Sequence, residues 1–171
     1  MDDLNWACAI GAKYLTQMSP RLQKESKLGI VVFDIDDTLV MGDPEGCIPV
    51  KEMEIGSELF ILPPNKPVKD LAIHAKKLGY KILALTARPM SSKAASIANL
   101  QMMGIPFDGI VMNDKDEDPF FKVKVRRSLE KPDRTVILTV GDQFCDCFLP
   151  GKSAAIKLPD PESKCAYVYI P

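Results

Sequence analysis

An apolar run that ends in acidic residues constrains the fold of this chain most. Gly29-Ile30-Val31-Val32-Phe33 is β-branched and aromatic, and Asp34-Ile35-Asp36-Asp37-Thr38 follows it directly. Such a run is typical of a buried parallel strand, and parallel strands present their binding residues just past their carboxyl ends. The sequence therefore predicts an α/β protein with three carboxylates at the edge of the sheet where ligands bind.

The spacing of the first two aspartates predicts a cation site. Asp34 and Asp36 are two residues apart, so the alternation of a strand places them on the same side. Two carboxylates this close repel each other unless a cation lies between them. Mg²⁺ is usually held by one or two carboxylates together with substrate phosphate and water. We therefore expect Mg²⁺ here; the alternative is a turn capped by aspartates.

Size and composition predict one domain, which we expect to span residues 1–171. Hydrophobic residues make up 46% and charged residues 26% of the chain, as in ordinary globular proteins. The net charge of −1 provides no overall positive field for nucleic acid or an anionic membrane. The five cysteines lack disulfide or zinc-site spacing, and neither a signal peptide nor a membrane span is evident. We expect a cytoplasmic protein without a membrane segment.

Helical and strand patterns alternate along the chain, which predicts a parallel sheet with right-handed crossovers. The remaining expected strands cover residues 81–85, 109–112, 135–140 and 154–157, and the expected helices cover residues 2–26, 67–78, 91–103 and 120–129. Residues 40–67 are rich in proline and glycine and too irregular for a long helix. We expect them to form a small insert after the first strand, with a short strand or hairpin arm at Ile55–Leu62.

The strong predicted strands end in polar residues that can do chemistry. Thr86-Ala87-Arg88 closes the second strand, and Asp142 closes the fourth, with Asp146 four residues further on. Since parallel strands bring their carboxyl ends to one edge, these side chains should converge with Asp34 and Asp36. Lys122, near the start of a predicted helix, adds a cation that can offset the charge of a phosphate.

These segments resemble, in order, the four motifs of the haloacid dehalogenase (HAD) superfamily of phosphohydrolases. The matching segments are Asp34–Thr38, Thr86, Lys122 and Gly141-Asp142-Gln143-Phe144-Cys145-Asp146, and the resemblance spans residues 29–158. Within the superfamily, the chain is most similar to the class-B and plant acid phosphatases and vegetative storage proteins, on Leu85–Pro89, Val140–Gln143 and Lys157–Pro159. The resemblance implies a Rossmann-like parallel sheet with flanking helices, in which the short insert at residues 40–67 would form a minimal cap.

The resemblance also implies a role for each residue. Asp34 would be the nucleophile that becomes an aspartyl phosphate, and Asp36 the general acid and base. Mg²⁺ would be bound by Asp34, the backbone carbonyl of Asp36, Asp142 and Asp146. Phosphate would be bound by Thr86, the Ala87 amide and Lys122. Two assignments stay open: Lys124 rivals Lys122, and Arg88 either contacts phosphate or forms an ion pair at the strand end.

The leading hypothesis is a Mg²⁺-dependent phosphomonoesterase that acts on small phosphoesters. A phosphatase for nucleic-acid 3′-phosphate ends is an alternative, because Lys122, Lys124, Arg126 and Arg127 form a basic cluster. A non-catalytic storage or binding protein on the same scaffold is another, and phosphoryl transfer to an alcohol is a third. A homodimer through the insert or the amino-terminal helix is also compatible with the sequence.

Overall fold

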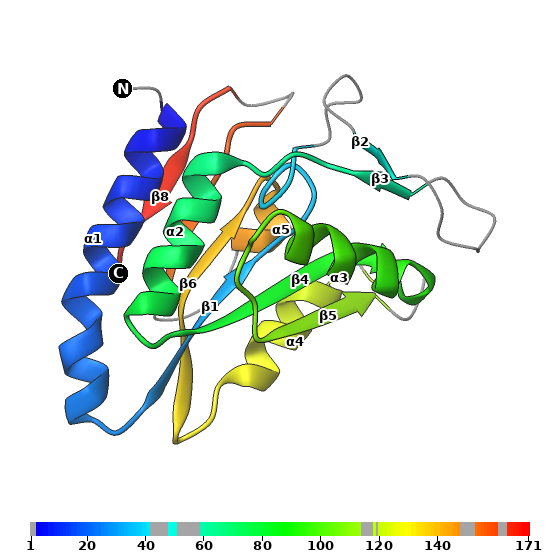
Figure 1. The fold of residues 1–171 in the computed structure, drawn as a ribbon. Helices are drawn as coiled ribbons and strands as arrows, with labels where there is room; N and C mark the ends of the chain where they lie inside the picture. Colours follow the sequence, from blue (N-terminus) through cyan, green and yellow to red (C-terminus); the bar gives the residue numbers. More distant parts are fainter. Residues whose placement is uncertain are drawn as a thin grey trace.

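The fold is built around a six-stranded sheet with strand order β5-β4-β1-β6-β7-β8 (Figure 1). The structure is a computed structural model, and it describes residues 3–41, 48–50, 59–113, 118, 120–147, 153–160 and 164–171. The strands of this sheet are β1 (Leu28–Phe33), β4 (Lys81–Pro89), β5 (Gly109–Asn113), β6 (Arg134–Gly141), β7 (Ala154–Lys157) and β8 (Tyr167–Tyr169). All neighbouring strands pair in parallel except β7 and β8, which pair antiparallel.

Helices cover both faces of the sheet, as Figure 1 shows. They are α1 (Asp3–Lys24), α2 (Lys66–Lys77), α3 (Lys93–Met102), α4 (Phe121–Leu129) and the short α5 (Phe144–Cys147), with a 3₁₀ turn at Met90–Ser92 before α3. A separate antiparallel pair, β2 (Ile48–Val50) and β3 (Leu59–Ile61), lies within the insert after β1. The predicted α/β architecture with flanking helices is therefore confirmed.

Strand β1 lies between β4 and β6, and its side chains divide between two apolar layers. Val31 and Phe33 belong to the larger core cluster, which also contains buried residues of α1, α2 and α3. Ile30 and Val32 belong to a smaller cluster, against which residues of α4 pack. Because both faces of β1 are buried, the strand is apolar along its whole length and fixes the position of Asp34.

Proline and glycine lie at the ends of two helices that the sequence predicted. Pro67 lies in the first turn of α2, and Gly79 follows that helix with a φ of 88°. Gly104 follows α3 with a φ of 61°. A positive φ strains residues that carry a side chain, so glycine is the favoured residue after each helix.

Three elements differ from the expectations. Strand β8 was not predicted, and its antiparallel pairing makes the sheet mixed. Strand β4 extends to Pro89, because Pro89 pairs with Asn113 after a register shift that follows Thr86. Helix α5 was not predicted either. Most of the expected arm at Ile55–Leu62 lies outside the described residues, as do residues 114–117 of the acidic loop.

Candidate active site

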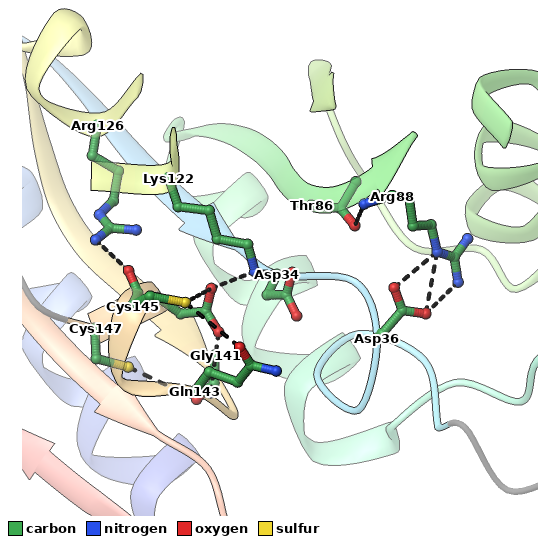
Figure 2. A network of polar contacts seen from close by, with 11 residues as sticks. Asp34, Asp36, Thr86, Arg88, Lys122, Arg126, Gly141, Gln143, Cys145 and Cys147 are labelled. Carbon is green, nitrogen blue, oxygen red and sulfur yellow. Dashed lines mark hydrogen bonds and ion pairs between the residues drawn. The ribbon is translucent and has the colours of Figure 1, made fainter. Parts of the chain in front are cut away.

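The site lies where β1, β4 and β6 end, at the same edge of the sheet (Figure 2). Asp34 follows β1, Thr86 and Arg88 lie near the end of β4, and Asp142 follows β6. The chain proceeds from β1 to β4 on one side and returns to β6 on the other. Ligands of open α/β sheets bind at such a reversal of strand order.

Lys122 of α4 is a buried cation in contact with two buried carboxylates. Its Nζ donates hydrogen bonds to Asp34 Oδ1 at 2.7 Å and to Asp146 Oδ1 at 2.5 Å. Burial acts to lower the pKa of Lys122, but the charges of Asp34 and Asp146 outweigh this effect and raise it. Lys124 is exposed instead and pairs with Asp118 at 2.7 Å. Of the two rival lysines, the structure brings Lys122 to the site.

The loop after β6 places Asp146 next to this lysine. The backbone amide of Gln143 donates to Asp146 Oδ2 at 3.1 Å. A Cβ at Gly141 would collide with the side chain of Asp146, so only glycine leaves room for this carboxylate. Arg126 is 1% exposed, and its Nη2 donates to the carbonyl of Cys145 at 2.6 Å. Arg126 and Lys122, one turn apart on α4, therefore both hold the segment that carries Asp146.

Three buried carboxylates form a cluster of hard oxygen ligands. One carboxylate oxygen from each of Asp34, Asp142 and Asp146 lies within 4.8 Å of the other two. Burial and the charge of Asp146 outweigh Lys122 and raise the pKa of Asp34 to about 7. Burial, and then Asp146, also raise the pKa of Asp142. The single charge of Lys122 does not balance the three carboxylates when all are ionised. Three clustered carboxylate oxygens with excess negative charge fit a Mg²⁺ ion.

The side chain of Asp36 lies outside this cluster and faces Arg88 (Figure 2). Arg88 contacts Asp36 through Nε at 2.9 Å and through Nη2 at 2.6 Å. Only the backbone carbonyl of Asp36 was expected to bind metal, so the position of its side chain is compatible with that expectation. Of the two roles considered for Arg88, phosphate contact and an ion pair at the strand end, the structure shows the ion pair.

Thr86 and Ala87 directly precede Arg88 on β4. Thr86 is 1% exposed, and its Oγ1 accepts a hydrogen bond from the backbone amide of Arg88 at 3.1 Å. Ala87 is exposed. The structure thus brings the predicted residues of β1, β4, α4 and the loop after β6 to one edge of the sheet. Sequence analysis missed Arg126 as a support of the site, although its spacing of four from Lys122 places both on one side of a helix.

Comparison with protein families places the chain among HAD phosphatases. The model of the HAD superfamily, subfamily IIIB (Acid phosphatase), matches residues 61–165. The chain belongs to this family of acid phosphatases. The resemblance to HAD acid phosphatases is therefore confirmed. No curated protein shows a significant match to the chain.

Solved structures support the same fold. The class C acid phosphatase from Bacillus anthracis has a TM-score of 0.57 at 20% identity, with 88% of this chain and 66% of that chain covered. Its structure with tungstate bound gives 0.56 at 20% identity, covering 87% and 66%. A chain of the Pnkp1/Rnl/Hen1 complex gives 0.55 at 21% identity, covering 70% and 41%. The chain thus spans less than two thirds of the length of these proteins.

No helix in the described part of the chain is both long enough and apolar enough to cross a membrane. The single-domain boundaries, the cytoplasmic location and the homodimer stay predictions.

Proposed function

We propose that the chain is a Mg²⁺-dependent phosphomonoesterase that hydrolyses small phosphoesters through an aspartyl phosphate on Asp34. The observation that carries this proposal is the buried contact of Lys122 with Asp34 and Asp146, beside Asp142. This arrangement at the end of β1 supports roles for Asp34 as the nucleophile, Lys122 as the cation and the three carboxylates as metal ligands. Membership in an acid phosphatase family supports the same reaction.

The reaction proceeds in two displacements. The Asp34 carboxylate attacks phosphorus, and the ester P–O bond breaks while Asp36 gives a proton to the departing oxygen. Water then attacks phosphorus and gives a proton to Asp36, and the bond between phosphorus and the Asp34 oxygen breaks, which releases inorganic phosphate and the Asp34 carboxylate. The Thr86 hydroxyl, the Ala87 amide and the Lys122 ammonium donate hydrogen bonds to the phosphoryl oxygens.

Four groups would hold the metal: Asp34, Asp142, Asp146 and the backbone carbonyl of Asp36. When bound, Mg²⁺ neutralises the negative charge that otherwise keeps a carboxylate away from a phosphate dianion. Lys122 then shares its charge between the nucleophile and the phosphoryl group.

The test is hydrolysis of p-nitrophenyl phosphate by the wild type and by Asp34→Asn, each with Mg²⁺ and with EDTA. We expect turnover only in the wild type with Mg²⁺, while Asp34→Asn keeps the far-UV circular dichroism spectrum of the folded protein. Intact activity in Asp34→Ala would refute the role of the nucleophile. A folded wild type that hydrolyses no phosphoester would favour the non-catalytic storage or binding protein.

The structure weakens the basis for a nucleic-acid 3′-phosphatase. Of the four cations on α4, Lys122 and Arg126 are buried and hold the site, Lys124 is paired with Asp118, and Arg127 is exposed. The helix therefore lacks the continuous exposed basic stripe that backbone binding needs. We expect 3′-phosphorylated oligonucleotides to turn over no faster than mononucleotides. A large preference for the oligonucleotide would restore this alternative.

A further inference from the structure

Arg88 joins three structural elements: the end of β4, the loop after β1 and helix α3. It lies near the end of β4, and its guanidinium contacts Asp36 after β1 and Ser96 on α3. The Asp36 side chain is 47% exposed and that of Arg88 is 19% exposed, whereas Ser96 is fully buried. Figure 2 shows Asp36 turned toward Arg88, while Lys122 contacts Asp34 on the other side. The pair thus lies on the solvent side of Asp34.

The geometry of this pair is more restrictive than that of a surface ion pair. Asp36 Oδ1 accepts from Nη2 at 2.6 Å and from Nε at 3.1 Å, whereas Oδ2 accepts from Nε alone at 2.9 Å. Nη1 donates to Ser96 Oγ at 2.8 Å, which ties the guanidinium to a buried position on α3. A planar guanidinium held at both ends fixes the plane of the carboxylate it contacts.

The exposed pair of Arg21, in the last turn of α1, and Glu25, just after that helix, provides a comparison. It is made by a single contact of 3.1 Å, and its side chains are 69% and 37% exposed. Neither residue is buried, so this pair has no anchor equivalent to Ser96. An exposed pair of this kind contributes little to structure, because solvent screens it.

We propose that Arg88 is a positioning residue that orients Asp36 for proton transfer to the leaving group. This inference rests on the proposed function. Two guanidinium nitrogens converge on Oδ1 and one on Oδ2, so we assign the proton exchange to Oδ2, the less occupied oxygen. In the first displacement that proton moves from Oδ2 to the ester oxygen as the P–O bond breaks. In the second, Oδ2 takes a proton from the attacking water, which restores the starting form.

A dependence on the leaving group distinguishes positioning from phosphate binding. The quantity kcat/KM reports on the steps through P–O cleavage, where an alkoxide leaving group needs a proton and p-nitrophenolate does not. A residue that positions the acid therefore matters for alkyl phosphates. A residue that binds phosphate matters equally for both esters, because both present the same phosphoryl group.

The experiment measures kcat/KM for glycerol phosphate and for p-nitrophenyl phosphate in the wild type, Arg88→Ala, Asp36→Asn and the double variant. We expect Arg88→Ala to lose about tenfold or more on glycerol phosphate and less than about threefold on p-nitrophenyl phosphate, within the range of general acid catalysis. In the Asp36→Asn background, Arg88→Ala should cause no further loss on glycerol phosphate, since the group it positions is gone.

Further variants test the same inference if Arg88→Ala folds poorly. Ser96→Ala removes the anchor and leaves the three hydrogen bonds to Asp36 in place, so it should cause a smaller loss with the same leaving-group dependence. Arg88→Lys and added guanidinium ion with Arg88→Ala should each restore part of the glycerol phosphate activity. Arg21→Ala, which removes the exposed pair at the end of α1, should match the wild type on both esters.

Three results would overturn the inference. Equal losses on both esters, with a matching rise in the inhibition constant of inorganic phosphate, would assign Arg88 to phosphate binding. Additive losses in the double variant would show that Arg88 acts independently of Asp36, and unchanged kinetics would show that Arg88 has no role. A wild type that turns over neither ester would instead overturn the proposed function, and the inference with it.

Discussion

Lys122 is surrounded by buried carboxylates, whereas Lys124, two residues later on the same helix, lies at the surface. Lys122 is 7% exposed and contacts Asp34 and Asp146. Removing one partner of a buried ion pair leaves the other charges uncompensated, while an exposed pair is screened by water. The two lysines therefore form a matched pair for mutation.

We expect Lys122→Met to lower kcat by about 10²-fold or more, because it removes a donor to the transferring phosphoryl group. It should also lower the free energy of unfolding of the metal-free protein by about 3 kcal/mol, as for other broken buried pairs. Lys124→Met should leave both quantities at the wild-type values. Urea unfolding and p-nitrophenyl phosphate kinetics measure them. Equal effects of the two substitutions would contradict the assignment of Lys122.

The protonation of Asp34 makes Mg²⁺ binding depend on pH. Its pKa is raised to about 7 by burial and by Asp146, whereas an unfolded aspartate titrates near pH 4 (about 3.9). The folded metal-free protein therefore retains a proton between these values that the unfolded chain has lost. Its free energy of unfolding should fall as pH rises from about 4 to about 7.

Mg²⁺ must displace this proton, so its affinity should rise with pH, by about tenfold per unit below pH 7 if one proton is released. The raised pKa of Asp142 acts in the same direction. Isothermal titration with Mg²⁺ at pH 5.5, 6.5 and 7.5 measures the trend. A dissociation constant that does not change over this range would show that Asp34 binds the metal without losing a proton.

The sequence predicted the acidic residues of the site better than their partners. Asp34 and Asp142 directly follow apolar strands, and a parallel sheet brings such ends together whatever the loops do. The choice between Lys122 and Lys124 depends on how α4 is rotated against the sheet, which its own sequence did not decide. The contact of Arg88 with Asp36 depends on a side-chain orientation, and no periodic pattern encodes that.

At the scale of elements, α1 depends on a glycine to approach the sheet. A Cβ on Gly11 would lie 2.6 Å from Ile156 Cδ1 of β7 and 3.4 Å from Leu71 Cδ2 of α2. Both neighbours are buried, so they have little room to move. The close contact of helix, helix and sheet at this point therefore requires the absence of a side chain.

We expect Gly11→Leu to lower the free energy of unfolding by about 1–3 kcal/mol, the usual cost of overpacking a core. Gly11 is not among the residues at the carboxyl ends of β1, β4 and β6 that form the candidate site, so the folded variant should keep its kcat at low temperature. Ala9→Leu, at an exposed position of the same helix, is the matched control and should remain as stable as the wild type. Urea midpoints of the two variants give the comparison; a Gly11→Leu protein with wild-type stability would show that α1 docks differently.

The elements that sequence patterns missed are short or have no clear period. Strand β8 has three residues and α5 has four, too few to show an alternation or a helical repeat. Both are held by contacts with distant parts of the chain: β8 pairs with β7, and Arg126 of α4 donates to a carbonyl of α5. The long buried strands and the helices with glycine stops were predicted because their signals are local.

At the scale of the whole molecule, the acidic cluster connects metal binding to folding. Asp34, Asp142 and Asp146 come from the ends of two strands and a short helix, and their carboxylates meet only in the folded chain. A ligand that binds the native state alone stabilises it in proportion to its saturation. Mg²⁺ should therefore report on the whole fold, although it contacts only one edge of the sheet.

We expect Mg²⁺ at 100 times its dissociation constant to raise the free energy of unfolding by about 2.7 kcal/mol. For a chain of this size, that corresponds to an increase in Tm of about 5–10 °C. Asp142→Asn should abolish most of the increase, because it removes a charged ligand. Asp70→Asn, which changes an exposed aspartate paired with Lys66 on α2, should retain the increase in full. Differential scanning calorimetry across a Mg²⁺ titration measures these shifts. An equal Tm with Mg²⁺ and with EDTA in the wild type would mean that the three carboxylates do not form a metal site, and that Lys122 alone offsets their charge.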